Sequence, residues 1–120
     1  MDILQNKLQE EVEKLQTIQK QHQKTLTARQ TLDSQLNENN LVKEEMDSLE
    51  SGANVFKLIG PAMVRQDVDE AKSNVDKRID YIKGELKRHE DQLKELDKKQ
   101  DEHRENLSNM QNQMQKLVQA

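Results

Sequence analysis

Three histidines and 23 acidic residues are the side chains of this sequence that could bind a metal ion or transfer protons. His89 and His103 fall on one helical stripe about four turns apart, which is too far for them to share a metal ion. His22 and His89 could lie opposite each other if the two helices predicted below pair. We interpret them as polar residues that fix the alignment of the two helices, in preference to a metal site. We expect the acidic residues to lie on solvated faces.

Catalytic motifs of other kinds are absent from the sequence. The three glycines stand at positions 52, 60 and 84, so they form no phosphate-binding loop. There is no cysteine nucleophile. No histidine stands beside a serine in a cleft either, because the two long helices predicted below are too thin to form one. We therefore expect no enzyme activity and no cofactor.

The composition favours a coiled coil over a compact globule. Hydrophobic residues make up 32% of the 120 residues and charged residues 35%, while Phe56 and Tyr81 are the only aromatic residues. The net charge of −4 comes from interspersed charges without a basic patch, which argues against nucleic-acid binding. No apolar run approaches the roughly 18 residues of a membrane span, and there is no signal-peptide core. These features predict a soluble intracellular protein that binds no membrane, and the family resemblance described below implies a cytoplasmic one.

Two long stretches have the apolar spacing of helices. The first covers about residues 2–45, and the second covers about residues 67–118, with Asp67 as its expected N-cap. Their narrow stripes are typical of a coiled-coil seam, the line along which two helices touch. Because the two stretches have similar lengths and are joined by a connection of roughly 20 residues, they should fold back on each other as an antiparallel pair. The second stripe repeats in heptads from Val75 to Leu117. The first stripe comprises Leu4, Leu8, Val12, Leu15, Ile18, Leu26, Leu32 and Leu36.

In an antiparallel pair, residues lie opposite each other when their numbers add to a constant. A sum of about 111 would place Leu4 by Leu107 and His22 by His89. This register would leave the residues after about 110 without a partner on the first helix.

A segment at residues 49–66 interrupts the helical pattern. Strand-forming residues at about 54–59 and 62–66 flank Gly60-Pro61, which is a turn signal, so we expect one β-hairpin. An isolated hairpin is marginally stable in water, and this one has open edges and apolar residues on both faces. We therefore expect the hairpins of several chains to assemble into a closed β-barrel from which the helices project. The residues expected to make this contact are Val55, Phe56, Leu58, Ile59, Met63 and Val64.

Several stretches of the sequence resemble the prefoldin family. They are residues 39–45 (NNLVKEE), 55–61 (VFKLIGP), 70–71 (EA) and 74–82 (NVDKRIDYI). The single hairpin is similar to the β class of prefoldin subunits, within which the eukaryotic subunit 6 branch is the most similar. One departure is Phe56, where tyrosine is common in the family.

The resemblance implies a heterohexamer in which this chain has two α-class and three further β-class partners. Its body would be a double β-barrel of hairpins that carries six coiled-coil arms. The family captures unfolded proteins, actin and tubulin among them, without ATP and delivers them to the cytosolic group II chaperonin (TRiC/CCT). Residues 1–120 would form one domain, with a helical arm (1–48), an assembly hairpin (49–66) and a second helical arm (67–120).

In the family, the ends of the arms hold the client. Methionine is flexible and polarisable, so Met114 and its neighbours suit a surface that adapts to many unfolded sequences. An ordinary coiled-coil seam is the competing interpretation, and it is favoured for Leu8 and Leu107. At the N-terminus, Met1 belongs to an apolar cluster with Ile3, Leu4 and Leu8. The expected client-binding residues are Ile3, Leu4, Leu8, Met110, Met114, Leu117 and Val118.

A structural coiled-coil tether or spacer of another complex is the alternative function. The hairpin argues against it, because a spacer gains nothing from strands that are apolar on both faces. A chaperone subunit is therefore the function that the sequence favours.

Overall fold

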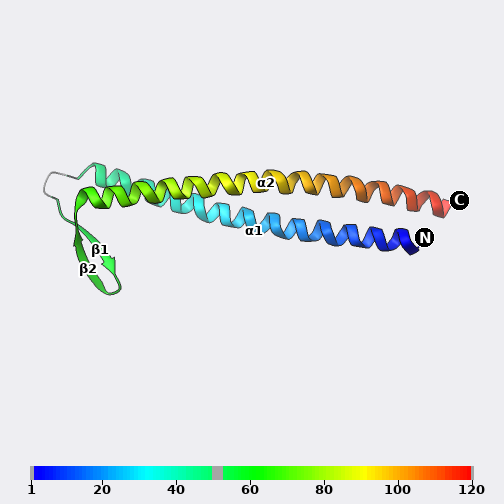
Figure 1. The fold of residues 1–120 in the computed structure, drawn as a ribbon, viewed down its shortest axis with the longest axis horizontal. Helices are drawn as coiled ribbons and strands as arrows, with labels where there is room; N and C mark the ends of the chain where they lie inside the picture. The colour runs from blue at the N-terminus through cyan, green and yellow to red at the C-terminus, as the bar shows by residue number, and fades with distance from the viewer. Residues whose placement is uncertain (1, 50–52, 120) are drawn as a thin grey trace. The chain divides into compact units, whose positions relative to one another are not determined.

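The computed structural model describes residues 2–49 and 53–119, which form two helices and one hairpin. Helix α1 spans Asp2–Asp47, strands β1 and β2 span Val55–Ile59 and Ala62–Gln66, and helix α2 spans Val68–Gln119 (Figure 1). The predicted elements and their order are confirmed, with shifts of one or two residues at their ends. Met1 and residues 50–52, which belong to the predicted tip and hairpin segments, lie outside the described residues.

These elements form two compact units. The helical unit contains residues 2–29 of α1 and 89–119 of α2, and the hairpin unit contains residues 30–49 and 53–88. Within each unit, a stretch of α1 lies beside a stretch of α2 in antiparallel orientation, as predicted (Figure 1). In the helical unit, the start of α1 and the end of α2 lie at the same end.

The hairpin unit has an apolar seam. The buried residues follow a spacing of three and four along α2, which places them on one helix face. On α1 of the same unit, Leu32, Leu36 and Met46 are half-buried. Burial of these aliphatic groups stabilises the pair by roughly 25 cal/mol for each Å² of apolar surface removed from water. The buried residues of α2 in this unit are Ala71, Val75, Ile79, Ile82 and Leu86.

The seam of the helical unit is more polar. Ile18, Leu93 and Leu96 are buried here, and so is the carboxylate residue Glu11. Half-buried polar residues continue the stripe, namely His22, Arg29, His89, Gln100 and His103. Polar seam residues select one register at a cost in stability. As far as the described residues go, neither helix has an apolar stretch long enough to cross a membrane.

The register of the helix pair differs from the predicted one by about a heptad. Four ion pairs join α1 to α2 among the described residues. In Glu11–His103 the residue numbers add up to 114, and in the other three they add up to 119, against the predicted 111. These three are His22–Asp97 and Arg29–Glu90 in the helical unit and Lys43–Asp76 in the hairpin unit. The predicted register, with His22 by His89, is therefore wrong. A heptad pattern looks the same after a shift of seven residues, so apolar spacing alone does not select the register.

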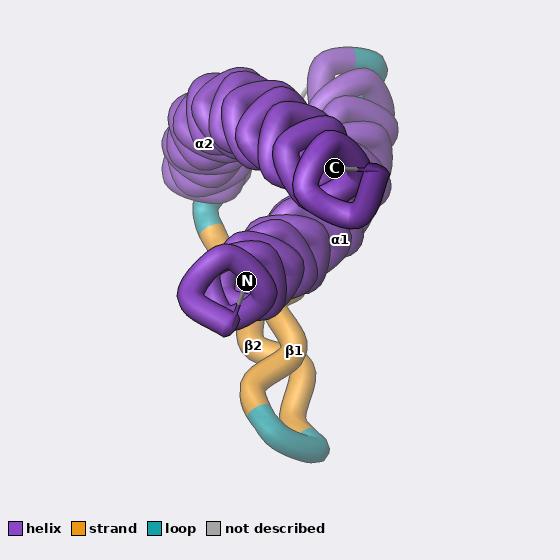
Figure 2. Tube along the Cα trace, turned by 90° about the vertical axis from the view of Figure 1, so that its right-hand side faces the viewer, coloured by secondary structure: helices purple, strands orange, loops and turns teal. Residues whose placement is uncertain are grey.

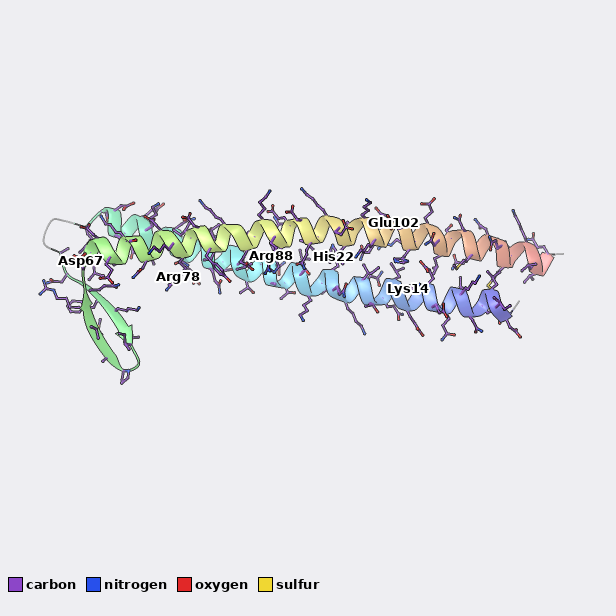
Figure 3. All side chains as sticks on the ribbon, viewed as in Figure 1. Lys14, His22, Asp67, Arg78, Arg88 and Glu102 are labelled. Atoms are coloured by element: carbon purple, nitrogen blue, oxygen red, sulfur yellow. The ribbon has the colours of Figure 1, made fainter. Side chains whose placement is uncertain are left out.

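Asp67 and Gly60 have the local roles that the sequence predicts. An Asp67 carboxylate oxygen accepts a hydrogen bond from the backbone N–H of Glu70 at 3.2 Å and so caps the start of α2 (Figure 3). Gly60 is the first residue of the two-residue loop between β1 and β2 and has a φ of 58°. A type II′ hairpin turn needs a positive φ at this position, which glycine adopts without steric cost. Figure 2 shows the hairpin in orange, with its loop directed away from the helices of its unit.

Candidate functional site

The hairpin carries a group of exposed apolar side chains, which we call the hairpin surface. All six predicted assembly residues lie in β1 or β2. Leu58 is 69% exposed and Met63 is 70% exposed, and only Val55 is half-buried. Leaving so much aliphatic surface in water is unfavourable for an isolated chain. The hairpin surface consists of Val55, Phe56, Leu58, Ile59, Met63 and Val64.

Apolar side chains occupy both faces of this two-stranded sheet. Phe56 pairs with Arg65 and Leu58 with Met63, and residues directly opposite each other share a face. The other face carries the pairs Lys57–Val64 and Ile59–Ala62. In the part of the chain that the structure describes, no third strand pairs with either edge. Both faces and both edges are thus available to other chains.

The helices of the hairpin unit do not close over the hairpin. A groove with a volume of about 520 Å³ lies between them, lined by Met46 of α1, Phe56 of β1, and Val75 and Arg78 of α2, among others. The chain therefore leaves even the inner side of its own hairpin incompletely covered.

At the free end of the helical unit, the predicted client-binding residues separate into two groups. Ile3, Leu117 and Val118 are 73%, 53% and 70% exposed, and we call these three the tip surface. Leu4, Leu8, Met110 and Met114 are half-buried. The prediction that the residues after about 110 lack a partner is therefore wrong for Met114, which is half-buried. Its place in the seam follows from the shifted register.

A polar cluster lies inside the seam of the helical unit. The carboxylate of Glu11 is close to the ring Nδ1 of His103 and accepts a hydrogen bond from the amide of Asn106 at 3.3 Å. The hydrogen bond with His103 holds the pKa of Glu11 below its ordinary value, while burial acts in the opposite direction. Burial is the weaker influence because a pair of helices is thin, so few further atoms surround the carboxylate beyond its immediate neighbours.

Replacing Glu11 with glutamine should remove a pH-dependent part of the stability of the helical unit. Because the folded-state pKa is lowered, the stabilisation is fully present above the ordinary value of 4.5 and is lost as the pH falls through the lowered value. Thermal unfolding followed by circular dichroism should show that the midpoint falls more steeply for the wild type than for Glu11→Gln between about pH 5 and pH 3. The exposed neighbour Glu13→Gln is the control and should behave like the wild type. Equal slopes for the wild type and Glu11→Gln would contradict this role.

Further charge pairs join the two helices along the seam. The Nε2 atom of His22 lies 2.9 Å from Asp97, and an Arg29 Nη2–H donates to Glu90 at 2.9 Å (Figure 3). In the hairpin unit, the hydrogen bond to Asp76 raises the pKa of Lys43. No group of three metal-binding side chains occurs among residues 2–49 and 53–119. These contacts align the helices and form no reaction centre.

Glu11 is the buried residue that the sequence analysis missed, since it assigned acidic residues to solvated faces. A signal for it exists in the spacing. The residues Leu4, Leu8, Glu11, Leu15 and Ile18 follow steps of four, three, four and three, whereas Val12 does not fit this heptad. Assigning each residue to its heptad position, whether or not it is apolar, places Glu11 in the seam.

Comparisons with known proteins agree on one family. A family model described as "Prefoldin subunit" matches residues 9–114. The chain is 46% identical to prefoldin subunit 6 of Mus musculus over 119 residues, covering 99% of this chain and 94% of that protein. It is 44% identical to prefoldin subunit 6 of Arabidopsis thaliana over 114 residues, covering 95% and 88%.

A solved structure supports the same conclusion at the level of the fold. The crystal structure of the prefoldin beta subunit from Thermococcus strain KS-1 matches with a TM-score of 0.79 and 25% sequence identity. The match covers 86% of this chain and 90% of that one. The two long helices with a hairpin between them are thus the architecture of that β subunit.

Proposed function

Because this chain belongs to the prefoldin subunit family, we propose that it is a β-class subunit of a heterohexameric chaperone that captures unfolded proteins without ATP. The chain is a chaperone subunit and not an enzyme, and it assembles with other prefoldin subunits. The observation that carries the proposal is that two exposed apolar surfaces lie on different units. The hairpin surface belongs to the hairpin unit and the tip surface to the helical unit.

The hairpin surface serves assembly in this proposal. Its exposed side chains and unpaired edges become buried when hairpins of neighbouring subunits close into a β-barrel, which has no free edges. Two α-class and three further β-class subunits complete the hexamer. The segment 49–66 is then the assembly element, and the segments 1–48 and 67–120 are the two helical arms of one domain.

The tip surface serves client binding. Ile3, Leu117 and Val118 give a small apolar contact, with the adaptable side chains of Met110 and Met114 in the adjacent seam. One such contact is weak, but several arms that hold one unfolded chain add their contacts and bind it by avidity. Weak individual contacts also permit release. The complex works in the cytoplasm, holds clients of the actin and tubulin type, and delivers them to the group II chaperonin TRiC/CCT.

A structural tether or spacer is the competing function. It accounts for the two paired helices, but it offers no use for a hairpin in which Leu58 and Met63 are exposed to water. The chaperone function accounts for both the helices and the hairpin.

Co-purification followed by native mass spectrometry tests the proposed function. The tagged chain should recover five other subunits in a particle of six chains, and this particle should suppress aggregation of unfolded actin without ATP. A stable dimer of this chain that recruits no α-class subunit would contradict the proposal and favour the tether.

A further inference from the structure

An exposed apolar residue surrounded by acids lies near the C-terminal end of α1. Leu41 is 60% exposed. Glu38, Glu44 and Glu45 stand three or four residues from it, so they share its helix face. We call these four residues the α1 surface.

The α1 surface lies on the side of α1 that faces away from α2. Lys43, two residues beyond Leu41 and therefore on the opposite side of the helix, forms an ion pair with Asp76 of α2 at 3.1 Å. Met46, which is half-buried, lies on that same opposite side. The helix pair of the hairpin unit is therefore formed without Leu41.

No ion pair compensates the three glutamates, Glu38, Glu44 and Glu45, among the residues that the structure describes. Glu44 and Glu45 also lie close to the C-terminal end of α1, whose last turn has no basic residue. Carboxylates at that end interact unfavourably with the helix dipole. The described ion pairs thus give these acids no stabilising contact in the isolated chain, and a basic partner would compensate them.

The chemistry that complements this surface is present on the hairpin. One face of the sheet presents Leu58 and Met63 beside Arg65, and the other presents Ile59 beside Lys57. The described segment 53–66 contains no acidic residue. The hairpin therefore combines exposed aliphatic groups with positive charge. The α1 surface combines an exposed aliphatic group with negative charge.

We propose that the α1 surface binds the apolar, basic β-hairpin of a neighbouring prefoldin subunit. This proposal rests on the assembly through hairpins stated above and adds to it a contact between the hairpin of one subunit and the helix of the next. Each chain then offers two different surfaces, a hairpin and an α1 surface, and such head-to-tail contacts close into rings. Opposite charges across the contact also select the correct neighbour and reject a hairpin that carries acids.

Charge reversal at two of these glutamates gives a result that separates the folding of the chain from assembly. In the isolated full-length chain, Glu44→Lys/Glu45→Lys should raise the midpoint of thermal unfolding by about 2 to 5 °C, because lysine interacts favourably with the helix C-terminus. In a mixture with the other subunits, the same variant should need about tenfold higher concentrations to form the hexamer. Leu41→Gln should also weaken assembly, and it should leave the unfolding midpoint unchanged because the side chain is exposed.

The matched control is Asp91→Lys/Glu105→Lys, which makes the same charge change at two exposed acids of the helical unit. It should assemble like the wild type. If the α1 variants also assemble like the wild type, the proposal is overturned. It is equally overturned if they assemble normally but fail to suppress client aggregation, since the surface would then bind clients.

Leu58→Asp on the hairpin distinguishes failure of this inference from failure of the proposed function. If Leu58→Asp prevents assembly and the α1 variants do not, the contact with α1 is absent while assembly through hairpins stands. If Leu58→Asp assembles as well, both proposals fail.

Discussion

Replacing Leu58 and Met63 with aspartate abolishes incorporation of this chain into the hexamer while both helices remain formed. The two residues are a cross-strand pair on one face of the hairpin and are 69% and 70% exposed in the isolated chain. Burial of each side chain against a partner contributes roughly 1.5 to 3 kcal/mol, and burial of an unpaired carboxylate costs several kcal/mol more. The affinity for partner subunits should therefore fall by about a thousandfold or more.

Size-exclusion chromatography of the mixed subunits measures this loss, and circular dichroism of the variant measures its helix content. The helices should persist because their seams contain no residue of the hairpin. A hexamer that contains the Leu58→Asp/Met63→Asp chain at wild-type yield would show that the hairpin surface has another use.

Replacing Ile3, Leu117 and Val118 with glutamine produces the opposite pattern, in which the hexamer forms normally but holds clients poorly. The three side chains are exposed, so their loss costs the helical unit little, and glutamine is a good helix former. Because a client is held by several arms at once, weakening one arm reduces avidity, and about tenfold more complex should be needed for half-suppression of aggregation. Light scattering of unfolded actin diluted into the assembled complex measures this concentration.

The two sets of substitutions serve as controls for each other, since each removes exposed aliphatic surface from a different unit.

Deleting residues 110–120 is a less specific test of the tip surface. It also removes Met110 and Met114, which are half-buried, and so it disturbs the seam around Leu4 and Leu8. Unchanged suppression by an assembled complex with the three glutamine substitutions would defeat the assignment of the tip surface.

The architecture could be predicted from the sequence because its signals are local. Heptad spacing marks each helix regardless of what it packs against, and Asp67 caps α2 with its own neighbours. The Gly60-Pro61 loop determines where the two strands meet, which sets the pairing of Val55 with Gln66 and of Ile59 with Ala62. These features need no knowledge of the rest of the chain.

The register could not be predicted, because it depends on contacts between distant residues. Successive heptads are nearly equivalent in apolar character, and the choice among them falls to polar contacts such as His22 with Asp97 and Glu11 with His103. Residue type alone identified neither contact, since Glu11 was assigned to a solvated face. The error in register then carried over to Met114 of α2, which was expected to be unpaired.

The separation of roles between the two units is the central claim, and site-specific photo-crosslinking of the assembled complex tests it most directly. A photoreactive residue at position 118 in the tip surface, or at position 58 in the hairpin surface, is incorporated before unfolded actin is added. The account predicts crosslinks from position 118 to actin and from position 58 to other prefoldin subunits. Crosslinks from position 58 to actin, with none from position 118, would contradict it.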